Sequence, residues 1–436
     1  MNAATIDIGP PSMRFDRCAN LLRNPSIHSL AWLSIEKAVQ LAFSFISIGI
    51  IARALGPQHY GEFQYVLAVL FIFSAVTLGC GAEVIAPDLV KLSYVKSRQG
   101  ILGSALLIRL ALGGVAMLLM ATSGLFWFSG TVGQGVAIMA LSLLIAEPFN
   151  ILRIIRESAS NTRVIARIRF QTSVLKLVAI AGVAALGGGV LSMLAIYLAE
   201  TIVIAAAYVY LIADDGRPWD WRPTRRHTAR LLRASVPVWL GLALMIGMQR
   251  MDRLVLGISL PPAIFGEYAA AMSLMDSVMF FGPVVMTALT PRLLYRHENL
   301  SIVARNAGRL LIILTCLGLA AVIGFYLFSG LLTTAIFGER FVQVQEILRA
   351  ASWITVVGFF DTGVTALLVR LRYFRLIAAK WLGGFLVCFL VLWLGDRGEW
   401  LTGIAGLIAG YTTAASIGMG TVFFKLRKSR MGVRAL

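Results

Sequence analysis

Apolar runs of membrane-spanning length alternate with short polar segments along nearly the whole chain. A helix that crosses the hydrocarbon core of a bilayer needs about 20 predominantly apolar residues. The runs therefore predict about twelve spanning helices in an all-α polytopic membrane protein. The predicted spans are 29–53, 60–86, 101–128, 132–152, 170–187, 190–211, 234–258, 264–289, 307–329, 343–368, 378–395 and 401–424.

Composition and charge distribution agree with this prediction. The chain is 58% hydrophobic and only 14% charged, which no soluble domain of this size could bury in one core. The formal net charge of +18 does not indicate nucleic-acid binding, because the basic residues are spread over many short connections rather than gathered in one patch. Most Lys and Arg lie in both tails and in alternate connections, so both termini are predicted to be cytoplasmic.

A short motif occurs once in each half of the chain. The segment LGPQHYGEF at 55–63 recurs as LPPAIFGEY at 260–268. Each joins the first two predicted spans of its half, and we expect both to be extracytoplasmic. Because each half has an even number of spans, the halves are predicted to be parallel repeats. The predicted parts are a tail (1–28), an N-lobe (29–211), a cytoplasmic linker (212–233), a C-lobe (234–424) and a basic tail (425–436).

Three segments carry a family resemblance: IIARALGPQHYGEF, MDRLVLG before FGEYAAA, and TTAIFGERFVQVQEILRAASWI. In their order and spacing the chain resembles the polysaccharide flippases of the MOP (multidrug, oligosaccharidyl-lipid, polysaccharide) exporter superfamily. The resemblance implies a multi-pass protein of the bacterial inner membrane, with two six-helix lobes around a central cavity. It implies translocation of an undecaprenyl-diphosphate-linked oligosaccharide by alternating access. The implied partners are that lipid-linked oligosaccharide, membrane lipids, a polysaccharide polymerase and chain-length machinery, without nucleic acid.

Ionisable and polar residues inside predicted spans are candidates for a functional site, because they are costly in hydrocarbon. Lys37 and Gln40 belong to a polar stripe on the first span, which forms a cavity wall or a helix–helix contact. In the seventh span, Gln249, Asp252 and Arg253 share a face, and Arg250 lies one turn below Arg253. Paired guanidiniums suit an anionic diphosphate, or they form an internal ion-pair network.

The remaining intramembrane charges have two possible roles each. Arg109 is a further cavity cation or extends its charged end to the membrane edge. Asp252, Asp276 and Asp361 carry a coupling ion or pair with cations, and for Asp276 we expect pairing with Arg250 or Arg253. The predicted substrate-binding set is Lys37, Gln40, Arg109, Gln249, Arg250 and Arg253.

Enzyme motifs are absent from the sequence. It has no zinc-protease H-E-x-x-H, no P-loop and no nucleophile elbow, so we expect no cofactor, no metal and no catalytic residue. Two alternatives stay open beside the flippase. A cation-coupled multidrug exporter of the same superfamily would line its cavity with carboxylates and aromatics. A membrane polysaccharide polymerase would need an extracytoplasmic acceptor surface.

Overall fold

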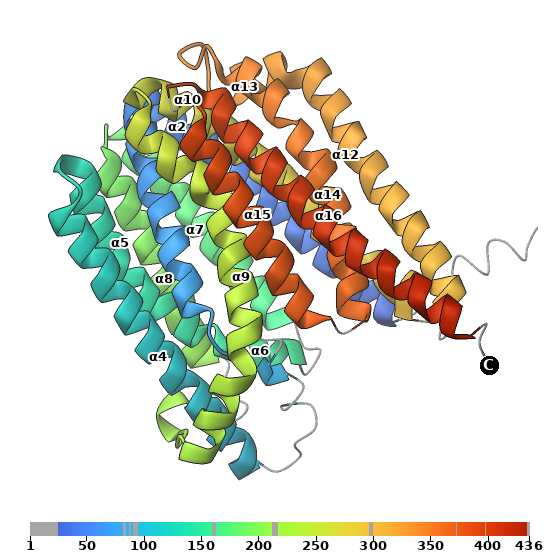
Figure 1. Ribbon diagram of the computed structural model, residues 1–436. Coiled ribbons are helices and arrows are strands. Elements are labelled where there is room, and N and C mark those ends of the chain that lie inside the picture. Colours follow the sequence, from blue (N-terminus) through green and yellow to red (C-terminus); the bar gives the residue numbers. More distant parts are fainter. Residues whose placement is uncertain are drawn as a thin grey trace, which may run out of the picture.

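The computed structural model describes residues 25–81, 84–86, 89, 95–158, 163–211, 217–295, 300–371, 373–396 and 398–433 (Figure 1). These residues form helices joined by short connections, without a strand among them. The elements of the first half are α2 (Pro25–Thr77), α4 (Val95–Phe126), α5 (Gly130–Phe149), α6 (Ile151–Ser158), α7 (Arg163–Ala185) and α8 (Val190–Leu211). The 3-10 helix η1 (Pro218–Asp220) lies between the halves. The second half holds α9 (Arg225–Ser259), α10 (Pro262–Met279), α11 (Phe281–Thr290), the π-helix η2 (Pro291–Tyr295), α12 (Leu300–Ile336), α13 (Val344–Ala351), α14 (Trp353–Arg370), α15 (Phe374–Leu394) and α16 (Trp400–Val433).

The helices confirm an all-α polytopic membrane protein. Among the described residues, 11 helices are long and apolar enough to cross a membrane. One of these, in α2, contains a sharp kink at Gly56, where φ is 72° and ψ is 171°. Only glycine adopts this backbone conformation at low cost, and Pro57 directly after it is well suited to begin the next helix. The kink therefore separates the first two predicted spans.

Several helices are longer than the sequence predicted, and the second span is shorter. The basic ends of α4, α9 and α12 extend the predicted spans at their first residues. Apolar runs mark only the part of a helix inside hydrocarbon, so polar turns beyond it escape detection. In the second span, α2 ends at Thr77 rather than at 86, and Cys80 has a φ of 60°, which a non-glycine residue in a helix does not adopt.

The two motif segments, here called the first tip (55–63) and the second tip (260–268), pack directly against each other. A methyl group added to Gly61 would lie 2.8 Å from the carbonyl oxygen of Pro262. In the reciprocal contact, a methyl group on Gly266 would overlap the carbonyl oxygen of Pro57. The two contacts are reciprocal, so equivalent positions of the repeated motif face each other.

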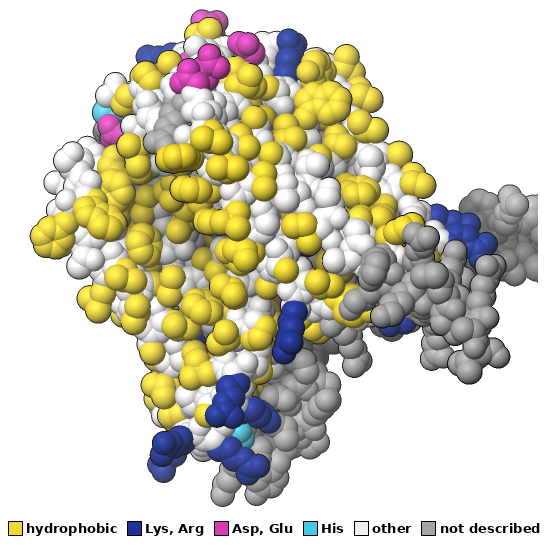
Figure 2. Space-filling model, viewed as in Figure 1, with side chains coloured by type: hydrophobic (Ala, Val, Ile, Leu, Met, Phe, Trp, Pro, Cys, Tyr) yellow, Lys and Arg dark blue, Asp and Glu magenta, His cyan; other side chains and the backbone are white. Residues whose placement is uncertain are grey.

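The helices form two lobes that meet at the tips and diverge away from them (Figure 1). The N-lobe contains α4 to α8 and both limbs of α2, which are the parts before and after the kink at Gly56. The C-lobe contains α9 to α16. We call the end with the tips the tip end, and the opposite end the basic end. In Figure 2, carboxylates gather at the tip end, whereas most basic side chains of this face lie toward the opposite end. A wide band of apolar side chains separates them, as expected for a lipid-facing belt.

The segment after α12 closes the tip end from the C-lobe side. Phe337 and Phe341 pack against Tyr60, with ring centroids 6.4 and 6.0 Å apart. Arg53 donates hydrogen bonds to the last carbonyl oxygens of α12, including 3.0 Å to Ile336 O and 2.5 Å to Ala335 O. A guanidinium at a helix C-terminus satisfies carbonyls that have no helical partner. These ring contacts and hydrogen bonds hold the two lobes together at the tip end.

Candidate substrate site between the lobes

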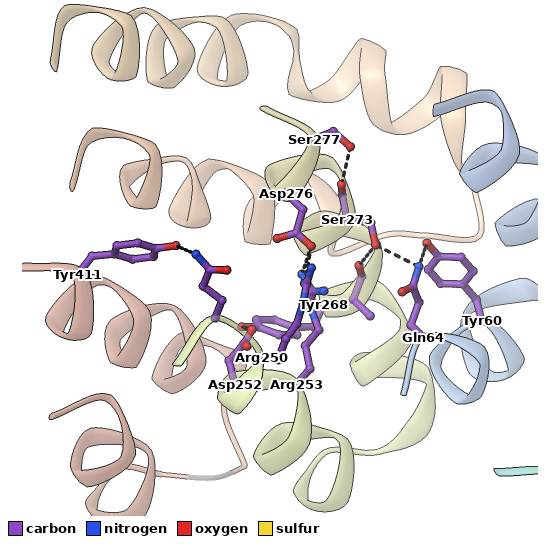
Figure 3. Close-up of polar contacts among 12 residues, drawn as sticks. Tyr60, Gln64, Arg250, Asp252, Arg253, Tyr268, Ser273, Asp276, Ser277 and Tyr411 are labelled. Atoms are coloured by element: carbon purple, nitrogen blue, oxygen red, sulfur yellow. Dashed lines mark hydrogen bonds and ion pairs between the residues drawn. The ribbon is translucent and has the colours of Figure 1, made fainter. Parts of the chain in front are cut away.

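Two arginines of α9 share one carboxylate of α10 (Figure 3). Arg250 Nη1 lies 2.5 Å from Asp276 Oδ2, and Arg253 Nη2 lies 2.7 Å from the same oxygen. The spacing of three residues places both guanidiniums on one side of α9, facing the neighbouring helix. The pairing expected for Asp276 is present, and it joins two cations to one anion.

This cluster faces the N-lobe and reaches open space. The guanidinium carbon of Arg250 lies 4.4 Å from the ring centroid of Phe71, which belongs to the second limb of α2. The Asp276 side chain is 38% exposed and that of Arg250 is 15% exposed, although both lie within spanning helices. A charged group that is accessible at this depth can meet a ligand without first losing all its solvation.

A polar contact between the lobes lies next to the cluster, on the side of the tips. Gln64 Nε2 donates to Tyr60 Oη at 2.6 Å and to Ser273 Oγ at 3.1 Å. Gln64 and Tyr60 come from the N-lobe, and Ser273 lies one turn before Asp276 on α10. The arginine cluster is therefore close to the surface along which the lobes would have to separate.

Asp252 and Gln249 bond to other side chains of the C-lobe and not to Asp276. Tyr268 Oη donates to Asp252 Oδ2 at 2.6 Å, and the carboxyl group is fully buried. Among the described residues, Asp252 Oδ1 has no hydrogen-bond partner. Gln249 Nε2 donates to Tyr411 Oη at 2.9 Å. Within the cluster, Asp276 and Arg250 are partly exposed, whereas the Arg253 side chain is only 5% exposed.

A mostly apolar pocket of about 580 Å³ lies nearer the basic end, between α9, α14 and α15. Its walls run from Arg230, close to the start of α9, to Met245 and Trp381. The Trp381 ring packs against Tyr411 with centroids 6.0 Å apart, and Tyr411 accepts the hydrogen bond from Gln249. The pocket therefore leads from the basic end toward the helical turn that carries the arginines.

The N-lobe also contains an ion pair between α7 and α8 that was not predicted from the sequence. Lys176 Nζ of α7 lies 2.9 Å from Glu200 Oε2 of α8, and 3.6 Å from the centroid of the Tyr197 ring. Both charged side chains are partly exposed, at 17% and 21%. The spacing of Tyr197 and Glu200, three residues apart on one helix face, was the signal that could have revealed this site.

Arg109 does not lie at the cavity, contrary to the prediction of a substrate contact there. Its side chain is 2% exposed. It donates to Cys80 O at 3.1 and 2.9 Å and to Glu147 O at 2.7 Å. These carbonyls belong to the end of the second span and to the turn before Pro148, where regular helical bonding is interrupted. Arg109 therefore holds three segments of the N-lobe together.

Asp361 is paired within the C-lobe. Lys380 Nζ lies 2.6 and 2.7 Å from its two carboxylate oxygens and 2.6 Å from Thr365 Oγ1. Lys380 is fully buried, because α15 begins at Phe374 and carries it well inside the spanning helix. Lys380 lies near the start of the predicted span 378–395, but the sequence analysis did not count it among the intramembrane charges and so missed the partner of Asp361.

The side chains of Lys37 and Gln40 lie outside the described residues, although α2 includes their positions. In the part of the chain that the structure describes, no group of His, Cys, Asp and Glu side chains could hold a metal ion.

Similar structures define the class of fold. An inward-facing multidrug resistance MATE family transporter of the MOP superfamily has a TM-score of 0.70 and 17% identity, covering 91% of this chain and 96% of that chain. The lipid II flippase MurJ, in an inward closed conformation, has a TM-score of 0.68 and 12% identity, covering 91% and 87%. A MOP superfamily transporter from Pyrococcus furiosus Vc1, reported with a binding pocket of reverse polarity, has a TM-score of 0.58 and 15% identity, covering 94% and 97%. The fold is that of the MOP superfamily.

The sequence also identifies the family to which the chain belongs. Residues 50–346 match the family of polysaccharide biosynthesis proteins, and the chain belongs to that family. The comparison with curated proteins finds no match. The matched range contains both tips, the arginine cluster and the segment that closes the tip end. The resemblance inferred from the motifs is thereby confirmed.

Proposed function

We propose that this protein is a flippase that moves an undecaprenyl-diphosphate-linked oligosaccharide across the bacterial inner membrane by alternating access. Membership in the polysaccharide biosynthesis family supports the substrate class. The likeness to a lipid II flippase supports the type of reaction, because lipid II is named there as the transported lipid. No bond in the substrate needs to be made or broken, so the protein acts as a transporter and not as an enzyme.

The observation that carries the proposal is the arginine cluster at the lobe interface. A diphosphate brings at least two negative charges into a space walled by hydrocarbon, where uncompensated charge is costly. Arg250 and Arg253 supply two guanidiniums, and Asp276 offsets only one of them. Guanidinium groups bind phosphate oxygens through pairs of parallel hydrogen bonds. A diphosphate that displaced Asp276 would complete the charge balance.

The orientation of the protein in the membrane is inferred from the distribution of charged residues between its two ends. The basic end faces the cytoplasm and the tip end faces outward, because Lys and Arg are retained on the cytoplasmic side. Both termini are then cytoplasmic. The described conformation is closed outside by the tips, Arg53 and Phe337, and its apolar pocket lies on the cytoplasmic side. A diphosphate would enter from that side, and rocking of the lobes would open the tips to release the sugar outside.

Asp276 gives the cycle a way to reset. While the site is empty, its carboxylate neutralises the arginines, as in the described structure. An arriving diphosphate competes with it, and after release the carboxylate returns. The substrate then needs only a differential affinity for the two lobe arrangements to drive the change. Lys37, whose side chain lies outside the described residues, remains a predicted substrate contact on the first span.

A cation-coupled multidrug exporter is the second candidate. It is favoured by the likeness to a MATE transporter and by the exposure of Asp276, which at 38% is the most accessible charged group of the cluster. A cationic drug would pair with that carboxylate, and the arginines would then only orient it. The two functions therefore assign opposite roles to the same residues. A polymerase finds no support in these likenesses, which are to transporters and a flippase.

The test is a pair of substitutions at Arg253 in a host that lacks its own copy of the gene. Arg253→Ala should abolish polymer export at unchanged protein level, and Arg253→Lys should restore it only in part, because an ammonium does not replace a bidentate guanidinium. Arg340→Ala, an exposed arginine at the tip end, serves as the matched control and should export normally. Full export by Arg253→Ala together with loss of drug resistance would favour the exporter instead.

A further inference from the structure

A second pocket, separate from the lobe interface, opens at the tip end of the C-lobe. It has a volume of about 700 Å³. It is enclosed by the second half of α12, by α13, and by the connection from α15 to α16. The side chains that give it its chemistry are Tyr326, Gln343, Glu346, Arg349, Glu399 and Trp400. This volume lies in the range typical of small-molecule sites in proteins.

The amphipathic helix α13 forms one wall of the pocket. Val344, Ile347 and Leu348 on one face are fully buried in the core. The opposite face presents Glu346 and Arg349 to the pocket, three residues apart and therefore neighbours on the helix surface. The core thus fixes the position of the polar face, so the pocket walls are held by packing rather than by flexible loops.

The pocket combines aromatic rings with hydrogen-bonding groups of both kinds. The Tyr326 side chain is 47% exposed, and Trp400 opens α16 beside it. Glu346 and Glu399 are exposed carboxylates, and neither has an ion-pair partner in the described parts of the chain. Arg349 is held in place by hydrogen bonds from Nε to Ser329 Oγ at 3.0 Å and from Nη2 to Tyr326 O at 3.4 Å, and its guanidinium has further N–H donors for a ligand.

We propose that this pocket is a saccharide-binding subsite that receives the oligosaccharide on the outer side of the membrane. The inference rests on the proposed flippase function. Flat aromatic faces stack on the C–H faces of pyranose rings, and carboxylates and guanidiniums bind pairs of neighbouring hydroxyls. Among the described lining residues, two carboxylates lie beside one guanidinium, and this excess of negative charge disfavours a phosphate or an acidic sugar. The polar lining disfavours a purely apolar drug. A neutral or amino sugar fits the remaining chemistry.

The pocket is mechanically connected to the closure of the tip end. The backbone N–H of Gln343, a lining residue, donates to the carboxylate of Glu267 in the second tip. Two residues earlier, Phe341 packs on Tyr60 of the first tip, with centroids 6.0 Å apart. A sugar bound beside Gln343 therefore contacts the segment that must move when the lobes separate outside. The subsite would hold the sugar as the tips close behind it.

The experiment measures binding of a free oligosaccharide to the full-length protein in lipid nanodiscs. The probe is the oligosaccharide fraction released by mild acid from the polyprenyl diphosphate lipids of the source cells. Saturable binding is expected with the wild-type protein. The variant Trp400→Ala with Glu346→Gln should bind about tenfold more weakly or worse, as truncation of an aromatic anchor does in other sites. Glu399→Gln, at an exposed position where folding is not at risk, should weaken binding by about threefold or more.

Matched controls isolate the pocket. Trp393→Ala removes an exposed tryptophan of α15 outside the pocket, and Glu339→Gln removes an exposed carboxylate after α12. Both should bind as wild type. Equal binding by wild type and by the Trp400 and Glu399 variants would overturn the subsite.

Failure of the subsite can be told apart from failure of the flippase proposal. The free oligosaccharide carries no diphosphate, so Arg253→Ala should bind it as the wild type does. Full polymer export by Arg253→Ala overturns the diphosphate site whatever the binding result. Absence of any sugar binding by a wild-type protein whose export depends on Arg253 overturns only the subsite.

Discussion

Arginines at two places in the membrane region differ in what their hydrogen bonds reach. In the N-lobe, Arg109 is 2% exposed and makes its shortest hydrogen bonds to backbone carbonyls of Cys80 and Glu147, with a longer contact of 3.5 Å to the Glu147 carboxylate. At the lobe interface, Arg250 and Arg253 donate to one side-chain carboxylate that is itself 38% exposed. Carbonyl partners belong to the fold and cannot leave. A carboxylate on a rotatable side chain can be displaced by a ligand of the same charge.

The difference teaches how to read a charge inside a membrane protein. Depth alone does not distinguish structure from function, because all three arginines lie in spanning helices. The identity of the arginine's partner and its accessibility distinguish a structural charge from a functional one. By this criterion the Lys380–Asp361 pair resembles Arg109, since both of its side chains are buried. The Lys176–Glu200 pair, which is partly exposed, resembles the cluster at the interface.

The largest effect is expected for Arg109→Ala. It would leave the carbonyls of Cys80 and Glu147 without partners in an apolar surrounding, at about 1–3 kcal/mol for each. We expect little folded protein, measured by size-exclusion chromatography of detergent extracts and by thermal unfolding. Arg375→Ala, an exposed arginine of α15, is the control and should fold normally. A well-folded Arg109→Ala protein that has lost only export would break the comparison and return Arg109 to the substrate site.

A second test asks whether the pair in the C-lobe is structural. Lys380→Met alone strands the buried carboxylate of Asp361 and should cost about 3–5 kcal/mol, seen as a lower unfolding temperature. The double variant Lys380→Met with Asp361→Leu removes both charges and should recover most of that loss, because buried ion pairs are often replaceable by apolar residues. Export should recover with it. A stable double variant without export would instead identify Asp361 as an ion-coupling residue.

The fold was largely predictable because one physical constraint dominates the sequence. Each span needs an apolar run of fixed length, and the runs located α7, α8 and α15 to within a few residues at most ends. The tips were recognisable because Gly56 and Pro57 have conformations that few other residues adopt. Polar helix ends were not recognisable, because beyond the bilayer no pattern of hydrophobicity distinguishes a helix from a connection.

The candidate site was predictable only in part. Spacing on one helix showed that Arg250 and Arg253 share a face, since helical periodicity is a local property. Partners on other helices depend on which helices pack together, which one sequence does not specify. Asp252 was therefore grouped with the arginines but bonds to Tyr268, and Lys380 was overlooked. The pocket at the tip end could not be predicted either, because its walls come from segments that are far apart in the sequence.

The smallest effect, and the finest test of the comparison, is expected for Asp276→Asn. The substitution keeps the shape of the side chain but removes the charge that competes with a bound anion. The carboxylate is partly exposed and therefore screened, so its removal should strengthen binding of inorganic pyrophosphate by only roughly two- to fivefold. Isothermal titration of the purified protein measures this change, with the charge-conserving Asp276→Glu as control. Export should become slower in the same variant, because a substrate that binds more tightly is released less readily. Weaker pyrophosphate binding by Asp276→Asn would mean that the carboxylate positions the arginines for the substrate and does not compete with it, and the distinction between fixed and displaceable partners would then not hold at this site.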